Sequence, residues 1–301
     1  MSEHTSLPSP ADDPALDQAR ALLAELRARA AAEAPALVEG LARLDALLAS
    51  VIASDEADAT IRTIRDESAS YASLIAHEVR LPLTSVRGYA DMLRQGISGP
   101  LTDMQMQFVN IIRDNALRME ELVNNINDLS KIRAGRLKLD RKMGMVRNVM
   151  QGVEKATRKL AEEKGHALVF ETPDGLPYLD IDNARVTEAV AKLVTNALMY
   201  TPPGAGQITV RAERDDGALR VTITDNGIGM SEAELARLGE AFWRADADLV
   251  RQQKGHGLGF AVAKGVIELH GGAVHVESAP GAGTTVSFTL PVVPGQEDRD
   301  S

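Results

Sequence analysis

Two long stretches of the chain carry apolar residues at helical spacing, and a short turn joins them. The first stretch is predicted to be a helix over residues 55–95, in which the apolar positions form one stripe: Tyr71, Ile75, Val79, Pro82, Val86, Tyr89 and Leu93. The second is predicted to be a helix over residues 102–134, with these residues on one face: Phe108, Ile112, Met119, Leu122, Ile126 and Leu129. Residues 95–100 are rich in glycine and end in proline, which predicts a turn and therefore an antiparallel hairpin.

One such hairpin cannot cover its own apolar stripe, whereas two copies can do so by packing as a four-helix bundle. The sequence therefore predicts a homodimer, built on a domain of residues 66–134. Upstream, residues 14–65 are read as a helical segment that acts as a coiled coil or as an input region, divided by Pro35. Residues 1–13 are polar and are expected to form a disordered tail.

From Gly135 onward, short alternating runs replace the long helical pattern. The runs predict strands at 137–139, 167–170, 207–212, 219–224, 273–277 and 284–290, with helices at 146–163, 183–199, 231–239 and 257–270. This pattern predicts an α/β two-layer sandwich over residues 135–293, followed by a short tail at 294–301. The expected fold class is therefore α+β multidomain, with the helical hairpin preceding the sandwich.

Composition narrows the choice of function. The apolar share of the 301 residues is 44%, which is enough to form cores, and the absence of cysteine excludes disulfides, thiolate metal sites and thiol catalysis. A net charge of −10 argues against nucleic acid or an anionic membrane as the partner. No apolar run reaches the length of a membrane span, and residues 1–5 do not resemble a signal peptide, so a cytoplasmic protein is expected.

His77 is the most informative single residue of the hairpin. It points roughly 150° away from the centre of the apolar stripe, given about 100° of rotation per residue, so we expect it to be exposed. Glu78 follows it directly, and Pro82 lies five residues further along the same predicted helix. A lone histidine on a helix is usually a bland surface residue, but this context makes His77 a candidate for chemistry.

Two glycine-rich segments in the predicted sandwich are candidates for ligand binding. Asp225 ends a predicted strand, and Gly227 and Gly229 follow it. A carboxylate in that place can accept a hydrogen bond from an exocyclic amino group such as that of adenine, although the same residues also suit an ordinary turn. The segment Gly255–Gly259 opens a predicted helix, where backbone N–H groups favour an anion such as phosphate.

Asn196 lies near the end of the helix predicted over residues 183–199. A neutral amide oxygen suits Mg²⁺, which keeps most of its waters and takes few ligands from a protein. A surface asparagine without any such role is the alternative interpretation. The remaining histidines, which are His4, His166, His256, His270 and His275, show no metal-ligand spacing.

Taken together and in this order, these segments resemble the ATP-binding domain that sensor histidine kinases share with gyrase, mismatch-repair ATPases and heat-shock chaperones. The segment around His77 narrows the resemblance to sensor histidine kinases, over roughly residues 66–292. The segments that carry it are a His box at 76–83, an Asn box around Asn196, Gly boxes at 225–229 and 255–259, and an aromatic box at 240–244.

The resemblance implies an ATP and Mg²⁺ site between the Asn-box helix and a lid at about 231–254. It implies that Asp225 reads adenine, that Tyr200 packs on the ring and that Asn196 holds Mg²⁺. The other nucleotide-binding residues that it implies are Gly227, Gly229, Gly255, Gly257, Leu258 and Gly259.

The resemblance also implies the reaction. His77 is expected to attack the γ-phosphoryl group, while Glu78 hydrogen-bonds the other ring nitrogen and takes up its proton. The phosphoryl group then passes to an aspartate of a response regulator, which is the expected partner in two-component signal transduction.

Three positions depart from the family's pattern. Leu81 stands one turn after His77, where the family usually has Thr or Asn to position a water, which puts phosphatase activity in doubt. Met199 replaces a usual Lys or Arg, and Lys192 replaces a usual Asn, which suggests a slower kinase. Two other readings remain open: an ATP-operated clamp, for which Glu188 is wrongly placed as the catalytic carboxylate, and a pseudokinase scaffold.

Overall fold

The structure is a computed structural model that describes residues 57–292, except 216 and 254. The described chain forms two compact units. One contains the chain up to Ala116 together with Arg133–Gly135, and the other contains Leu117–Ile132 and the chain from Arg136 onward. The predictions for residues 1–13, for 14–56 and for the tail at 294–301 lie outside the described residues.

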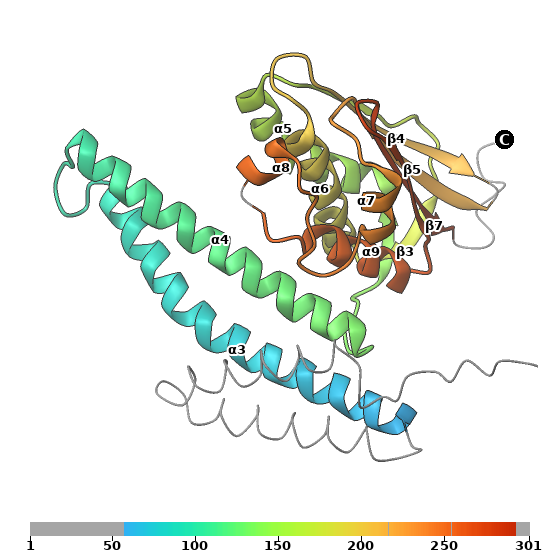
Figure 1. Ribbon diagram of the computed structural model, residues 1–301, viewed down its shortest axis with the longest axis horizontal. Helices are drawn as coiled ribbons and strands as arrows, with labels where there is room; N and C mark the ends of the chain where they lie inside the picture. Colours follow the sequence, from blue (N-terminus) through green and yellow to red (C-terminus); the bar gives the residue numbers. More distant parts are fainter. Residues whose placement is uncertain (1–56, 216, 254, 293–301) are drawn as a thin grey trace, which may run out of the picture. The chain divides into compact units, whose positions relative to one another are not determined.

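The predicted hairpin is present as two long helices, α3 (Ala57–Arg94) and α4 (Asp103–Arg133), which lie within two residues of the predicted bounds (Figure 1). Thr102 and Gln105 exchange hydrogen bonds of 2.9 and 3.3 Å between side chain and backbone, which fixes the start of α4. Arg113 on α4 donates to Asp91 on α3 over 2.7 Å, an ion pair across the hairpin. None of the described helices combines the length and the apolarity needed to cross a bilayer.

Mostly small residues, rather than the large apolar ones, are buried along the hairpin. On α3 the buried positions recur every seven residues: Ala69, Ala76, Leu83 and Ala90. Several large side chains of the predicted stripes stay exposed, among them Tyr89 at 68% and Phe108 at 57%, whereas Leu129 near the end of α4 is buried. A single chain therefore leaves a wide apolar surface on both helices uncovered.

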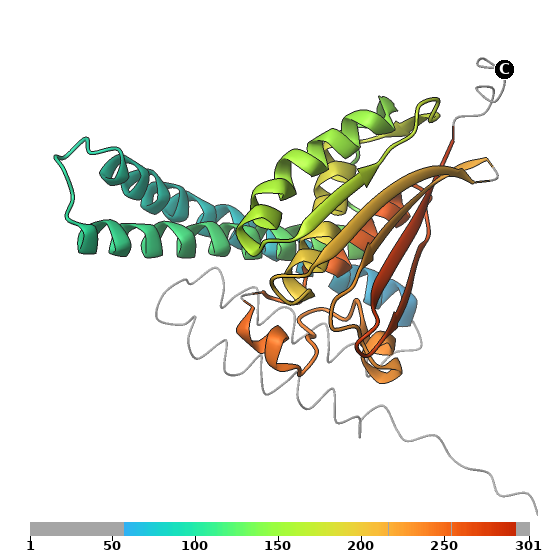
Figure 2. The same cartoon turned by 90° about the horizontal axis from the view of Figure 1, so that it is seen from above.

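The sandwich consists of a five-stranded sheet, a two-stranded ladder and the helices packed on them (Figure 2). Its elements are β1 (Lys142–Met145), α5 (Val146–Lys164), β2 (Ala167–Glu171), β3 (Tyr178–Ile181), α6 (Asn183–Tyr200), β4 (Gln207–Asp215), β5 (Ala218–Asp225), α7 (Glu232–Arg237), α8 (Asp248–Gln252), α9 (Gly259–Leu269), β6 (Val274–Ala279) and β7 (Gly283–Pro291). The sheet has the order β2-β4-β5-β7-β6, in which β2 and β4 are parallel and every other pair is antiparallel.

The sequence prediction was wrong in one place in this domain and incomplete in others. The strand predicted at 137–139 is irregular chain, and the first strand is β1, which pairs with the unpredicted β3 with Met143 opposite Asp180. Both strands are only four residues long, which is too short for a clear alternation of apolar and polar positions. The short helix α8 was also missed, whereas the other predicted strands and helices are confirmed.

Helix α6 is placed by its apolar face and by its N-terminal cap. Its buried residues recur at spacings of three and four: Val186, Ala189, Val190, Leu193, Val194, Ala197 and Leu198. The Asp182 carboxylate accepts a hydrogen bond from the Arg185 N–H over 3.1 Å, which starts the helix. Because this face lies in the core with Ile208 of β4 and Phe288 of β7, the register of α6 along the sheet is fixed.

His270 is a buried histidine with both ring nitrogens engaged. It is only 1% exposed, its Nδ1 lies 2.8 Å from the Val266 carbonyl oxygen, and its Nε2 accepts the Asp182 N–H over 3.0 Å. This arrangement requires a neutral ring with the proton on Nδ1. Burial lowers the pKa of His270, against the opposing effect of the hydrogen bond to Val266.

We expect the free energy of unfolding to fall as the pH drops below about 6.5, the pKa of an unfolded histidine. The folded-state pKa of His270 is lower, so the unfolded chain binds more protons over that range and acid favours unfolding. A single histidine can contribute a slope of at most about 1.4 kcal/mol per pH unit. Urea unfolding at several pH values measures this slope. His270→Gln, which keeps an acceptor but cannot titrate, should flatten the slope, whereas His275→Gln on the exposed part of β6 should not.

Candidate active site

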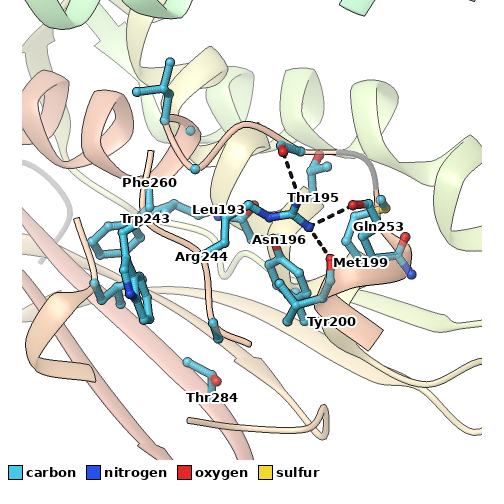
Figure 3. A pocket seen from close by; sticks show the side chains of 18 of the residues that line it. Leu193, Thr195, Asn196, Met199, Tyr200, Trp243, Arg244, Gln253, Phe260 and Thr284 are labelled. Atoms are coloured by element: carbon cyan, nitrogen blue, oxygen red, sulfur yellow. Dashed lines mark hydrogen bonds between the residues drawn. The ribbon is translucent and has the colours of Figure 1, made fainter. Parts of the chain in front are cut away.

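A cavity of about 250 Å³ opens in the sandwich between α6, the end of β5, the segment after α7 and the start of α9 (Figure 3). It brings together most of the residues that the sequence analysis assigned to a nucleotide. The predicted residues that line it are Asn196, Tyr200, Asp225, Gly229, Gly255, Gly257, Leu258 and Gly259. Gly227 is the exception and lies outside the lining.

Asp225 closes one part of the cavity with a partly satisfied carboxylate. It ends β5 and is 9% exposed. Its Oδ1 accepts the N–H groups of Gly227 over 2.8 Å and Thr284 over 3.2 Å, while Oδ2 has no hydrogen bond to any residue between 57 and 292 that the structure describes. Burial raises the pKa of the Asp225 carboxyl, and the two N–H donors oppose that rise. One carboxylate oxygen is thus left to accept a donor from a ligand.

Glycine is required where the turn after Asp225 passes close to a neighbouring strand. Gly229 has a φ of +63°, and a Cβ atom there would lie 1.9 Å from the Ala279 carbonyl oxygen. Gly227 has a separate role, because its N–H is one of the two donors that hold Asp225. Together these contacts set the direction of the Asp225 side chain.

Asn196 and Tyr200 reach the cavity from the last turns of α6, where Figure 3 shows both side chains near Arg244. They lie four residues apart and so share one face of the helix. Apolar side chains from other elements complete this wall: Leu193, Ile223, Ile228, Phe260 and Val286. A wall of this composition suits a flat apolar ring, with polar groups at its margin.

Arg244 holds the segment that borders the other side of the cavity. Its Nη1 donates to the Gly255 carbonyl over 2.9 Å, and its Nη2 donates to the carbonyls of Gln253, over 2.8 Å, and Val250 (Figure 3). These bonds fold the chain that leads from α8 to the second glycine segment. Gly257, with a φ of +68°, fits there because a Cβ atom would lie 2.5 Å from the Trp243 carbonyl oxygen.

The N-terminus of α9 faces the cavity through Leu258, Gly259 and Phe260. The first backbone N–H groups of a helix have no partner within the helix and lie at the positive end of its dipole. An anion in the cavity would therefore meet donors as well as a favourable field.

The lining residues that were not predicted as site residues include three polar ones from α4. Arg118, Glu121 and Asn125 line the cavity from α4, in the part of that helix that belongs to the same compact unit as the sandwich. Sequence analysis assigned α4 only to the hairpin. Their spacing of three and four was the available signal, because it puts three polar residues on one side of a helix.

The remaining candidates other than Met199 lie outside the cavity lining. His77 and Glu78 are exposed on α3, as is Leu81 at 57%. Lys192 does not line the cavity and instead pairs with Glu188 over 3.4 Å, whereas Met199 does line it. The described residues hold no cluster of three or more His, Asp or Glu side chains suited to a metal ion.

The fold combines a helical hairpin with a sandwich that contains a cavity lined by two glycine-rich segments. Residues 181–294 match the family model for the histidine kinase-, DNA gyrase B-, and HSP90-like ATPase. Residues 68–135 match the model for the His Kinase A (phospho-acceptor) domain. The chain carries both domains in this order and belongs to the histidine kinases.

Individual relatives agree with this assignment. The chain is 34% identical to histidine protein kinase DivJ of Caulobacter vibrioides, over 80% of this chain and 40% of that protein. It is 30% identical to sensor histidine kinase WalK of Bacillus subtilis, over 77% of this chain and 38% of that protein. The chain thus spans less than half the length of these two relatives.

Solved structures show the same fold. Full-length ShkA in complex with AMPPNP matches with a TM-score of 0.64 at 26% identity, over 75% of this chain and 46% of that chain. The histidine kinase AdeS of Acinetobacter baumannii matches with a TM-score of 0.51 at 18% identity, over 72% of this chain and 98% of that chain, which speaks for the fold alone.

Proposed function

We propose that this chain is an ATP-dependent protein histidine kinase that phosphorylates its own His77 and passes the phosphoryl group to an aspartate of a response regulator. The observation that carries the proposal is the combination, in one chain, of an exposed histidine inside the phospho-acceptor match and the cavity inside the ATPase match. ShkA, a structural relative, was solved with the ATP analogue AMPPNP.

Adenine suits the inner part of the cavity. The free Oδ2 of Asp225 can accept a hydrogen bond from the 6-amino group, and Tyr200 can pack on the ring beside the apolar wall. A buried acceptor of this kind discriminates against bases that offer no donor there. The lining glycines Gly229, Gly255, Gly257 and Gly259 let the backbone approach the nucleotide closely, while the Gly227 N–H holds Asp225.

The phosphate chain suits the outer part, near the N-terminus of α9 and the residues Gly255–Gly259. The Asn196 amide oxygen is a fitting ligand for Mg²⁺, in keeping with the small number of protein ligands that this ion takes beside substrate phosphates. When bound, Mg²⁺ supplies positive charge that offsets the charge developing on the transferred group.

In the proposed reaction the lone pair of a neutral His77 ring nitrogen attacks the γ-phosphorus, and the bond from that phosphorus to the β,γ-bridging oxygen breaks. The products are phosphohistidine and ADP. Glu78 accepts a hydrogen bond from the other ring nitrogen and takes up its proton as positive charge develops on the ring. The exposure of His77 and Glu78 on α3 supports access by both ATP and a partner protein.

We also propose a homodimer, with residues 66–134 as its dimerisation and phosphotransfer domain and 135–293 as its ATP-binding domain. The exposed apolar side chains on α3 and α4 support this, because one chain leaves them uncovered. Two hairpins packed as a four-helix bundle would bury them.

The two rival functions receive less support. An ATP-operated clamp needs a carboxylate at the reacting end of the cavity, but Glu188 is turned to Arg185 and Lys192 and does not line the cavity. A pseudokinase scaffold is favoured only by Met199 and Lys192, while Asn196, Asp225, His77 and Glu78 all remain.

One experiment separates the three functions. The protein is incubated with γ-labelled ATP and Mg²⁺, and both released phosphate and protein-bound label are measured. We expect acid-labile label on the protein. Released phosphate without label would favour the clamp, and nucleotide binding with neither product would favour the scaffold.

Leu81 gives a prediction about the reverse activity. Its side chain cannot orient a water, so the wild-type protein should leave its phosphorylated regulator to decay at nearly the intrinsic rate. Leu81→Thr adds a hydroxyl one turn from His77 at an exposed position and should raise the rate of regulator dephosphorylation about tenfold or more. Leu81→Val has the same branching without the hydroxyl and is the matched control. Strong acceleration of regulator dephosphorylation by the wild-type protein would contradict this account of Leu81.

A further inference from the structure

The segment Leu117–Ile132 of α4, called here the docked segment, lies in the same compact unit as the ATPase sandwich. Arg185 at the start of α6 donates to the Asp128 carboxylate over 2.6 Å, and the Asp128 side chain is only 9% exposed. Leu129 belongs to the hydrophobic core of the sandwich. Ile132 lies against α9 at Gly265, where a Cβ atom would come within 2.7 Å of its side chain.

This attachment turns one face of the docked segment to the cavity. Arg118, Glu121 and Asn125 follow one another at spacings of three and four, on the same side of the helix as Leu129. All three line the cavity. Asn125 is 4% exposed, yet its amide has no hydrogen bond to another residue of the described part of the chain. An amide without a partner in a cavity wall is available to hydrogen-bond a ligand.

The charged side chains that line the cavity indicate which kind of ligand group binds there. Among the described lining residues, the two arginines are Arg118 and Arg244. Both Nη atoms of Arg244 are engaged by the carbonyl groups of its own loop, and its Nε is buried without a hydrogen-bond partner in the described part of the chain. Arg118 has no ion pair or hydrogen bond within the described residues, and Met199 contributes only a thioether to the same cavity. Arg118 is thus the lining arginine whose paired Nη groups are left to meet an anion.

We propose that Arg118, assisted by Asn125, binds the phosphate chain of the nucleotide in this cavity. The proposal rests on the ATP site proposed above and adds a binding residue from outside the ATPase domain. The triphosphate is the anionic part of ATP, and a guanidinium matches it with paired hydrogen bonds. The nucleotide then bridges the docked segment and the sandwich, so its binding tightens their attachment.

The test measures the dissociation constants of a non-hydrolysable ATP analogue and of adenosine for the full chain by calorimetry. Arg118→Gln should weaken the analogue about tenfold and leave adenosine unchanged, because adenosine carries no phosphate. Arg118→Lys should recover part of the loss. Arg133→Gln removes the same charge from an exposed position of α4 outside the cavity and should have no effect.

Three other outcomes of this calorimetric test would contradict the proposal, and they can be told apart. Unchanged affinity of Arg118→Gln for the analogue would show that Arg118 does not contact phosphate. Equal weakening of the analogue and adenosine would show a structural role. If the wild type bound neither, the ATP site itself would be wrong, and the inference about Arg118 would fall with it.

Amide hydrogen exchange provides a second, independent readout. Addition of the analogue should slow exchange in the docked segment of the wild type, and it should do so less in Arg118→Gln. Adenosine should have a smaller effect than the analogue on both proteins. Exchange in this segment that does not respond to the analogue would contradict the proposed bridge.

Discussion

His77→Gln should abolish labelling of the protein by γ-labelled ATP while leaving ATP affinity within about twofold of the wild type. Glutamine retains a polar side chain of similar length but offers no nucleophilic ring nitrogen, so the loss of label should be about a thousandfold or more. Affinity should persist because His77 lies on α3, in a different compact unit from the cavity. Autoradiography and calorimetry on the same preparation measure the two effects.

The control for this variant is His275→Gln, which removes an exposed histidine from β6 and should label normally. Two results would contradict the assignment. Label that survives in His77→Gln would place the acceptor elsewhere, and acid-stable label would point to a different kind of acceptor residue. A loss of ATP affinity as large as the loss of label would mean that His77 takes part in nucleotide binding.

The fold was largely predictable because most of its elements are long or strongly patterned. Helix α6 carries seven buried apolar residues at helical spacing, and β4 and β5 alternate between buried and less buried positions along most of their length. The β1–β3 ladder was not predictable, because four-residue strands depend on the partner that tertiary packing brings to them. The burial of Ala69 and Ala76 instead of the large apolar stripe was also missed, since periodicity shows where apolar faces lie but not which of them is covered within one chain.

The candidate site could be predicted where the residues that form it are neighbours in the sequence. A strand end followed by a turn predicted Asp225 and the glycines after it, and a helix start predicted the segment Gly255–Gly259. The cavity is lined by Asp225, by Gly229 and by residues of the segment Gly255–Gly259. Their part in nucleotide binding stays a prediction. The position of Arg118 and Asn125 at the cavity could not be predicted from the sequence, because the packing of Leu129 and Ile132 on the sandwich is what turns that face of α4 to the cavity. The carbonyl contacts of Arg244 depend in the same way on how the loop folds.

Asp225→Asn should weaken ATP binding by about 10-fold to 100-fold, the cost of about 1–3 kcal/mol for an unsatisfied buried polar group. The two backbone N–H groups of Gly227 and Thr284 already occupy one side of the carboxylate, so they would hold the amide oxygen of an asparagine. The amide NH₂ group would then replace Oδ2 and face the 6-amino group of adenine, donor against donor. Calorimetry measures the loss, and Asp174→Asn on an exposed loop is the matched control.

The same substitution should also change base preference, which a general weakening of the fold would not do. Inosine triphosphate has a carbonyl oxygen where ATP has the 6-amino group, so the wild-type Asp225 should reject it and the amide of Asp225→Asn should accept it. We expect the ratio of the dissociation constants for inosine triphosphate and ATP to fall by about tenfold or more in the variant. A variant that keeps the preference for ATP over inosine triphosphate would show that another group reads the base.

The binding of ATP should also depend on pH through Asp225. Burial raises the pKa of the Asp225 carboxyl, so acid should weaken ATP binding by the wild type as the carboxylate is protonated. This pH effect should disappear in Asp225→Asn.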